Sequence, residues 1–394
     1  MKNIEIVFAI ILLFLTAFAF AQDGTDVPAD KRANLVPTGI GGGLVPTMYG
    51  ENRTWVWLDM QFRYNNFLGR PGQRLDFDMG IWESRRFGTI WHIPVGESNY
   101  FFDIGALVGR DPSLVFEREL SPFFNTLSRF GRNIADNHQV SYEISPRFRK
   151  YNKMSQNTSG NWQATEVEDE FWEVYQRLRY RFRTSDNLYP PMLSTFAQVS
   201  LNTNAMLAFE DCVFWGISGE LSQNIPVSYM LRHSFLLRTR FDITPIGERH
   251  KYGGLLTGGM DFVRGWDDDF IGSKEDVYFS NRAIGTAEYQ FYIATLPEMR
   301  FGFASFISPS LKGFRPILTG ALFLDAGYLF ENLTEPKKSI SADAASTGIS
   351  IRLLQPHMRT GGAIDIAWQI AGTQKYLKNN RAVPTIHLGF VQHF

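Results

Sequence analysis

The chain has 394 residues, of which 44% are hydrophobic and 20% are charged, and its mean hydropathy is -0.17. Several apolar spans of about 20 residues would raise that average well above zero, so the composition excludes a helical transporter. With 39 Lys+Arg against 40 Asp+Glu the formal net charge is -1, and no general attraction to nucleic acid is expected. Because Cys212 is the one cysteine in the sequence, an internal disulfide and a cysteine-based zinc site are also excluded.

The N-terminus has the features of a secretory signal. Lys2 precedes a nearly unbroken apolar run over 6–20, and Ala19-Phe20-Ala21 fits the small-residue rule for cleavage. We therefore expect residues 1–21 to be removed, with an uncleaved anchor as the alternative.

Segments with a period-two alternation of apolar and polar residues run through the rest of the chain. They occur at 54–65, 74–82, 171–183, 229–243 and 386–394. In the first of them, Val56, Leu58, Met60, Phe62 and Tyr64 occupy one face, and Asp59, Gln61 and Arg63 the other. Side chains alternate in this way on a β-strand, so we predict strands with one apolar and one polar face.

One of these segments carries four arginines spaced two apart on its polar face, at 177, 179, 181 and 183. Charges at this density cannot be buried in an apolar core without partners. We interpret the row as a face wetted by water, and a binding site is the alternative.

The length of the alternating segments indicates a membrane protein. Strands of soluble sandwiches usually have about five or six residues, whereas about 10 to 15 alternating residues are typical of transmembrane barrels. In lipid such a sheet must close, because an open edge leaves backbone groups unpaired. We therefore predict an all-β fold, a 16-stranded antiparallel transmembrane β-barrel. The strands are expected near 38–48, 54–66, 73–84, 87–95, 99–109, 139–151, 170–184, 194–206, 210–223, 229–243, 284–294, 301–308, 318–330, 346–356, 361–371 and 384–394.

The connections are expected to be alternately short and long. Short, turn-like connections are expected at 49–53, 67–72 and 186–191. Long ones are expected at 110–138, 151–169, 244–282 and 331–345, with a further strand within 112–130 as an alternative.

The most specific stretch is 255–266, with the sequence LLTGGMDFVRGW. It resembles the loop signature of the BamA-type outer-membrane superfamily, the bacterial surface antigen barrel, in which a Val-Arg-Gly-aromatic tetrad lies in a long extracellular loop. Further elements resemble the same family in the same order: 65–75 (NNFLGRPGQRL), 287–291 (AEYQF), 323–327 (FLDAG) and the terminal Phe394. The resemblance covers essentially all of 35–394.

Two of these segments each contain a carboxylate that the period-two alternation places on the face opposite the apolar one. Glu288 lies opposite the apolar face of 286–293, and Asp325 opposite that of 322–328. Two inward carboxylates on neighbouring strands need a cation, and an arginine can bind carboxylates bidentately. The resemblance implies that Arg264 is this cation, that Glu288 and Asp325 hold it, and that the loop motif of Val263, Arg264, Gly265 and Trp266 folds into the lumen.

Members of this family usually carry periplasmic POTRA domains before the barrel. We expect residues 1–21 to be the signal, 22–34 a short periplasmic segment too small for a POTRA domain, and 35–394 the barrel. The first strand contains Gly41, Gly42, Gly43 and Pro46, and should therefore pair poorly with the last strand, which ends at Phe394. We predict a weak seam there; the alternative is that the glycines only accommodate a curved corner of the sheet.

Three functions remain open. The resemblance implies a factor for insertion or translocation of outer-membrane proteins through the gated seam, in the outer membrane of a Gram-negative cell. The alternatives are a passive, anion-favouring channel and a structural barrel that anchors a partner complex. No enzymatic activity, cofactor or metal site is expected. The expected partners are outer-membrane lipid, client barrel proteins, and periplasmic or lipoprotein accessory proteins, with no nucleic acid.

Overall fold

The computed structural model describes most of the chain from residue 35 onward. The described residues are 35–46, 54–65, 67–70, 72–82, 85–96, 98–113, 118–156, 162–184, 193–206, 214–247, 263–266, 279–297, 316–331, 341–354, 360–373 and 384–392. The expected signal and periplasmic segments therefore lie outside them. In this part of the chain no helix is both long and apolar enough to cross a membrane.

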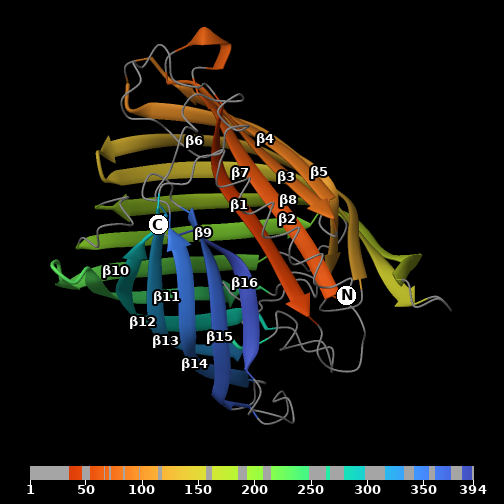
Figure 1. Cartoon of the computed structure of the whole chain (residues 1–394). Helices are drawn as coiled ribbons and strands as arrows, with labels where there is room; N and C mark the ends of the chain where they lie inside the picture. The colour runs from red at the N-terminus through yellow and green to blue at the C-terminus, as the bar shows by residue number, and fades with distance from the viewer. Residues whose placement is uncertain are drawn as a thin grey trace.

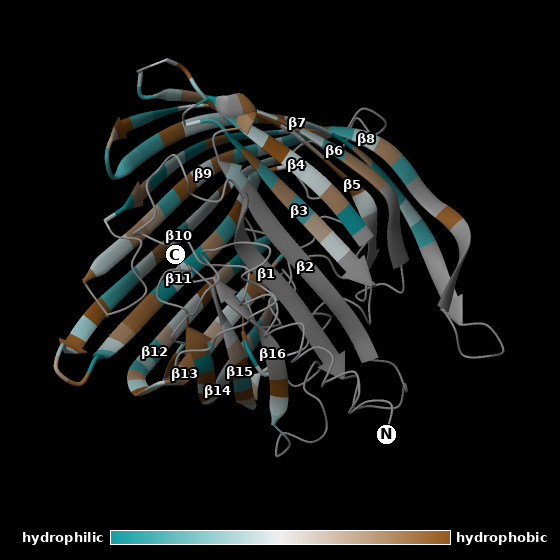
Figure 2. Cartoon of the chain, turned by 45° about the horizontal axis from the view of Figure 1, so that its top comes forward, coloured by the Kyte–Doolittle hydropathy of each residue, from teal (hydrophilic) through white to brown (hydrophobic). Residues whose placement is uncertain are grey.

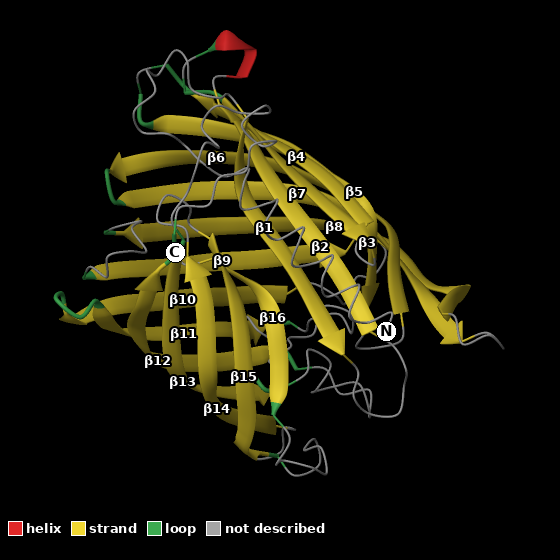
Figure 3. Ribbon diagram, viewed as in Figure 1, coloured by secondary structure: helices red, strands yellow, loops and turns green. Residues whose placement is uncertain are grey.

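The strands form one curled, antiparallel sheet in the order β1 to β16, so that each strand pairs with its neighbours in sequence (Figures 1 and 3). A short 3-10 turn, η1 (Phe67–Gly69), joins β2 to β3. The strands are β1 (Leu35–Pro46), β2 (Thr54–Asn65), β3 (Arg74–Trp82), β4 (Arg85–Pro94), β5 (Tyr100–Ser113), β6 (Arg118–Ala135), β7 (His138–Gln156), β8 (Trp162–Arg183), β9 (Ser194–Met206), β10 (Phe214–Ser228), β11 (His233–Ile246), β12 (Asn281–Thr295), β13 (Ile317–Phe330), β14 (Ser341–Leu354), β15 (Thr360–Gly372) and β16 (Thr385–Gln392).

Burial alternates along the strands, as the sequence periodicity predicts. On β13, Leu322 and Leu324 are exposed, whereas Phe323 and Asp325 are buried. Figure 2 shows the corresponding alternation of hydrophobic and hydrophilic residues along the strands. Many large apolar side chains thus lie on the outer face and many charged ones on the inner face, which is the reverse of the usual arrangement in a soluble protein.

β1 and β16, the two ends of the sheet, lie side by side (Figure 1). Backbone hydrogen bonds join each strand from β1 to β15 to the next strand in sequence. Within the described residues no such ladder joins β1 to β16. The predicted all-β antiparallel fold is confirmed. Closure of the sheet and the count of 16 strands in a closed barrel stay predictions, and the strand expected at 301–308 lies outside the described residues.

Two of the expected long connections are wrong. The region 110–138 contains the end of β5 and all of β6, so the alternative of a further strand is correct. The region 151–169 is mostly strand, because β7 continues to Gln156 and β8 begins at Trp162. The sequence of this region is mostly polar, as in 163–170 (QATEVEDE). Backbone pairing continues there, whereas the apolar alternation that identifies a strand in sequence does not.

Candidate functional site

The tetrad Val263 to Trp266 belongs to the connection between β11 and β12 and packs on the inner face of the last strands of the sheet. Val263 and Trp266 are fully buried, in contact with Ile284 of β12 and Ala344 of β14. Gly265 has a φ of 88°, a backbone conformation that glycine adopts without strain. The glycine thus allows the tetrad to turn while its neighbours on both sides stay buried.

Arg264 is held by the two carboxylates that alternation places on the inner face. Its Nε and Nη2 donate to the two carboxylate oxygens of Asp325 at 2.7 and 2.8 Å. Its Nη1 lies 2.8 Å from Oε1 of Glu288. All three side chains are almost completely buried, so both ion pairs are shielded from water.

An aromatic ring completes the pocket of the guanidinium. The Cζ atom of Arg264 lies 3.5 Å from the ring centroid of Phe323, a short cation–π contact. Gly348 on β14 is paired with Phe323 on β13, and a Cβ atom there would lie 2.5 Å from the ring. Because Gly348 has no side chain, the ring of Phe323 has room to lie against the guanidinium of Arg264.

Two charged residues of the cluster were missed by the sequence analysis. Arg352 on β14 donates from Nη2 to Oε1 of Glu288 at 2.7 Å, so this carboxylate binds two arginines. Asp365 on β15 is buried, and its Oδ1 lies 4.0 Å from Nη1 of Arg264. Their alternation within β14 and β15 indicates that they point inward, but no motif connected them with Arg264.

The tetrad also contacts the end of the sheet. The carbonyl oxygen of Gly265 accepts hydrogen bonds from Gln369 on β15, at 2.9 Å, and from Thr385 on β16, at 3.1 Å. The indole nitrogen of Trp266 donates to the carbonyl of Ala345 at 3.3 Å. The loop is thus bound to the strand that ends the sheet as well as to the carboxylates.

The arrangement favours a permanently charged arginine. Burial by itself would lower the pKa of Arg264, but Glu288, Asp325 and Asp365 outweigh it and raise that pKa above its usual value. Within the described residues no group of three or more His, Cys, Asp or Glu side chains could hold a metal. The cluster therefore holds the loop to the sheet through buried ion pairs.

The seam residues are described in part. Gly41, Gly42 and Gly43 lie in β1, where they pair with Asp59, Leu58 and Trp57 of β2. The ladder between these strands has a register shift between Pro37 and Gly39. Phe394 lies outside the described residues.

A family model, the Omp85 superfamily domain, matches residues 124–383, which is more than half of the chain. The chain belongs to the Omp85 superfamily. The resemblance to BamA-type proteins that the loop motif indicated is confirmed. No match was found among curated protein sequences.

Solved structures show the same fold at low sequence identity. The crystal structure of BamA from Haemophilus ducreyi lacking POTRA domains 1-3 is 14% identical, with a TM-score of 0.57, over 91% of this chain and 70% of that chain. CdiB from Escherichia coli is 12% identical, with a TM-score of 0.54, over 89% of this chain and 62% of its own. CdiB from Acinetobacter baumannii is 11% identical, with a TM-score of 0.56, over 91% and 59%. The chain thus spans less than two thirds of either CdiB chain.

Proposed function

We propose that the protein is an outer-membrane β-barrel of a Gram-negative cell, in which β1 to β16 close into a 16-stranded barrel over residues 35–394. The exposed apolar side chains on its outer face and the buried charged ones on its inner face support this proposal. An apolar outer band suits lipid, and a polar interior suits a lumen. Residues 1–21 act as the signal and 22–34 as a periplasmic segment in the same proposal.

Its function in this proposal is the insertion or translocation of outer-membrane proteins through a seam between β1 and β16. The observation that carries it is that these strands lie side by side with no ladder between them in the described residues. An edge that opens exposes backbone donors and acceptors on which a client strand can pair. The glycines of β1 favour such an opening, because glycine weakens a strand.

In this proposal the Arg264 cluster holds the loop against the inner face of the sheet, and the loop positions the edge strand β16 from inside the lumen. Arg264 fixes the loop to β12 and β13, and Gly265 accepts a hydrogen bond from Thr385 of β16. The loop therefore connects β12 and β13 with one edge of the seam. Client proteins and accessory proteins are the proposed partners.

A disulfide across the seam is expected to remove most of the client-assembly activity. We suggest Gly42→Cys in β1 combined in turn with cysteine at Leu388, Gly389 or Phe390 of β16. An oxidised, cross-linked protein should lose most of its ability to insert a barrel client into liposomes, because the edges can no longer separate. Reduction of the same sample should restore it.

The matched control is Gly42→Cys with Leu58→Cys, which links Cα partners of the β1–β2 ladder and leaves the seam free. This control should retain the activity of the unmodified protein when oxidised. Full client assembly by the cross-linked seam variants would contradict gating and favour a structural barrel that anchors a partner complex.

The inner arginines of β8 favour a second candidate, a passive channel for anions. Arg177, Arg179, Arg181 and Arg183 share the inner face, and a row of positive side chains in a pore selects anions. The channel function predicts a large, steady, anion-selective current in planar bilayers, whereas the assembly function predicts small and irregular openings. Reversal potentials in a salt gradient measure the selectivity.

A further inference from the structure

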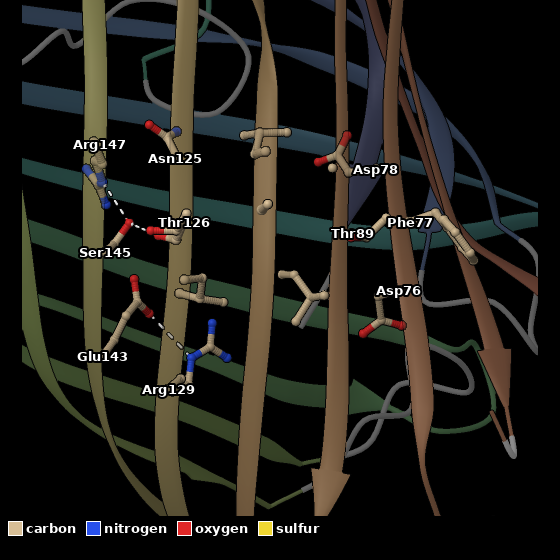
Figure 4. Close-up of a pocket in the computed structure, with 15 residues that line it drawn as sticks. Asp76, Phe77, Asp78, Thr89, Asn125, Thr126, Arg129, Glu143, Ser145 and Arg147 are labelled. Atoms are coloured by element: carbon tan, nitrogen blue, oxygen red, sulfur yellow. Dashed lines mark hydrogen bonds and ion pairs between the residues drawn. The ribbon is translucent and has the colours of Figure 1, made fainter. Parts of the chain in front are cut away.

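Most inward-facing arginines of the sheet are paired with carboxylates. Arg149 on β7 lies 2.6 Å from Glu173 on β8, and Arg238 on β11 lies 2.8 Å from Glu220 on β10. Arg129 on β6 contacts two carboxylates, as Figure 4 shows for one of them. Pairing of this kind offsets the cost of removing a guanidinium from water.

Arg179 on β8 departs from this pattern. Its side chain is on the inner face with only 8% exposure, and its Nε is buried without a hydrogen-bond partner. Within the described residues it forms neither a hydrogen bond nor an ion pair. A buried cation in this state is costly, and such a group in a native protein requires an explanation.

Three of the charged groups near Arg179 are other arginines, and one is a carboxylate, Glu143. Arg129, Arg177 and Arg181 all lie close enough to repel its charge. Arg177 donates to the hydroxyl of Tyr175 at 2.8 Å, and Arg181 donates to the amide oxygen of Gln198. Both of these acceptors are uncharged.

The nearby carboxylate does not supply the missing partner. Glu143 on β7 accepts a hydrogen bond from Arg129 at 3.3 Å, and Arg129 also lies 3.2 Å from Asp103. The Cα partners of Arg179 on the two neighbouring strands are Ser141 on β7 and Ser200 on β9, which are both buried. Hydroxyl groups can donate to an anion, and they do not repel it.

Open space lies next to this cluster. A cavity of about 440 Å³ runs along the inner face of β3 to β7, and Arg129, Glu143 and Ser145 are among the residues that line it (Figure 4). Arg179 itself does not line the cavity, but Arg129 belongs both to the lining and to the arginines around Arg179.

We propose that Arg179, with Ser141 and Ser200 beside it, binds an oxyanion of the phosphate type on the inner wall. A guanidinium presents its donors in a planar fork that matches phosphate oxygens, and the flanking arginines concentrate anions at this place. The anion supplies the negative charge that the wall lacks there. This site is independent of the proposed function, since an assembly factor, a channel and an anchor could each contain it.

The test measures phosphate binding to the full chain folded in detergent micelles. Sodium phosphate should raise the Tm of the wild-type protein by a few degrees beyond sodium chloride of equal ionic strength. Titration calorimetry with inorganic phosphate should give a Kd that Arg179→Gln weakens about tenfold or more. Glycerol 3-phosphate is the second probe. If only inorganic phosphate binds, the ligand is free phosphate; if both bind with equal Kd, the site also accepts a phosphate group on a small molecule.

Two variants separate binding from structure. Without phosphate, Arg179→Gln should be at least as stable as the wild-type protein, because it removes an uncompensated buried charge. Arg238→Gln, which alters a paired arginine of the same wall, should leave the phosphate Kd unchanged. An equal Tm rise with chloride, or an unchanged Kd in Arg179→Gln, would overturn the proposal and indicate screening of the wall by salt. A loss of stability in Arg179→Gln without phosphate would also overturn it, because the arginine would then be a structural residue.

Discussion

Replacement of Arg264 by alanine is expected to destabilise the folded protein by about 3–5 kcal/mol, since it removes one partner of a buried charge cluster. Asp325 would lose both of its side-chain ion contacts with Arg264, and Glu288 would lose one of its two arginines while keeping Arg352 and the hydrogen bond from Gln290. The cation–π contact with Phe323 would disappear as well. Urea unfolding in micelles and the heat-modifiable mobility of the folded form measure the effect.

The conservative change Arg264→Lys distinguishes geometry from charge. An ammonium cannot reach two oxygens of Asp325 and one of Glu288 in the planar arrangement of a guanidinium, so most of the loss should persist. The exposed Arg70 near η1 offers a control, because Arg70→Ala removes the same charge at the surface. Equal unfolding midpoints for Arg264→Ala and Arg70→Ala would show that the cluster does not stabilise the fold.

Addition of a single methyl group at Gly348 is expected to have the second largest effect. A Cβ atom there would lie 2.2 Å from the carbonyl oxygen of Ile366 and 2.5 Å from the ring of Phe323. The ring or the neighbouring strand must move, and Arg264 stacks on that ring. We expect Gly348→Ala to cost about 1–3 kcal/mol, as overpacking of an interior usually does. Urea unfolding in micelles measures this change.

Gly285 on β12 provides the matched control for this glycine. A Cβ atom at Gly285 would meet nothing within 4 Å, so Gly285→Ala should change the free energy of unfolding by less than about 0.5 kcal/mol. If both alanine variants unfold at the same urea concentration, the close approach at Gly348 has no energetic consequence.

Much of the fold could be predicted because the side-chain period of a strand appears directly in the sequence. The alternation of Leu322, Leu324 and Tyr328 with Asp325 correctly places the carboxylate on the inner face. The prediction failed where apolar and polar residues do not alternate regularly along a strand. All of β6, together with the ends of β7 and β8 beyond Tyr151 and before Glu170, was expected to be loop for this reason, with a further strand in 112–130 as the alternative.

The candidate site was predictable only as far as its motif extends. Arg264, Glu288 and Asp325 belong to segments that resemble a family in a fixed order, and the structure places them in contact. Arg352, Asp365, Phe323 and Gly348 join the same cluster through the register of β12 to β15. A shift of one residue in any of these ladders would turn the side chains to the other face, and sequence alone does not specify the register.

Local sequence is therefore enough to predict that this chain forms antiparallel strands with apolar outer and charged inner faces, since alternation is a property of each strand. Partners across the sheet depend on the whole structure. Register and curvature bring a loop arginine to the carboxylates of three strands, β12, β13 and β15, and leave the Arg179 side chain without a partner among the described residues. Pairing of charges is a matter of distances between strands far apart in sequence, and only the tertiary structure determines those distances.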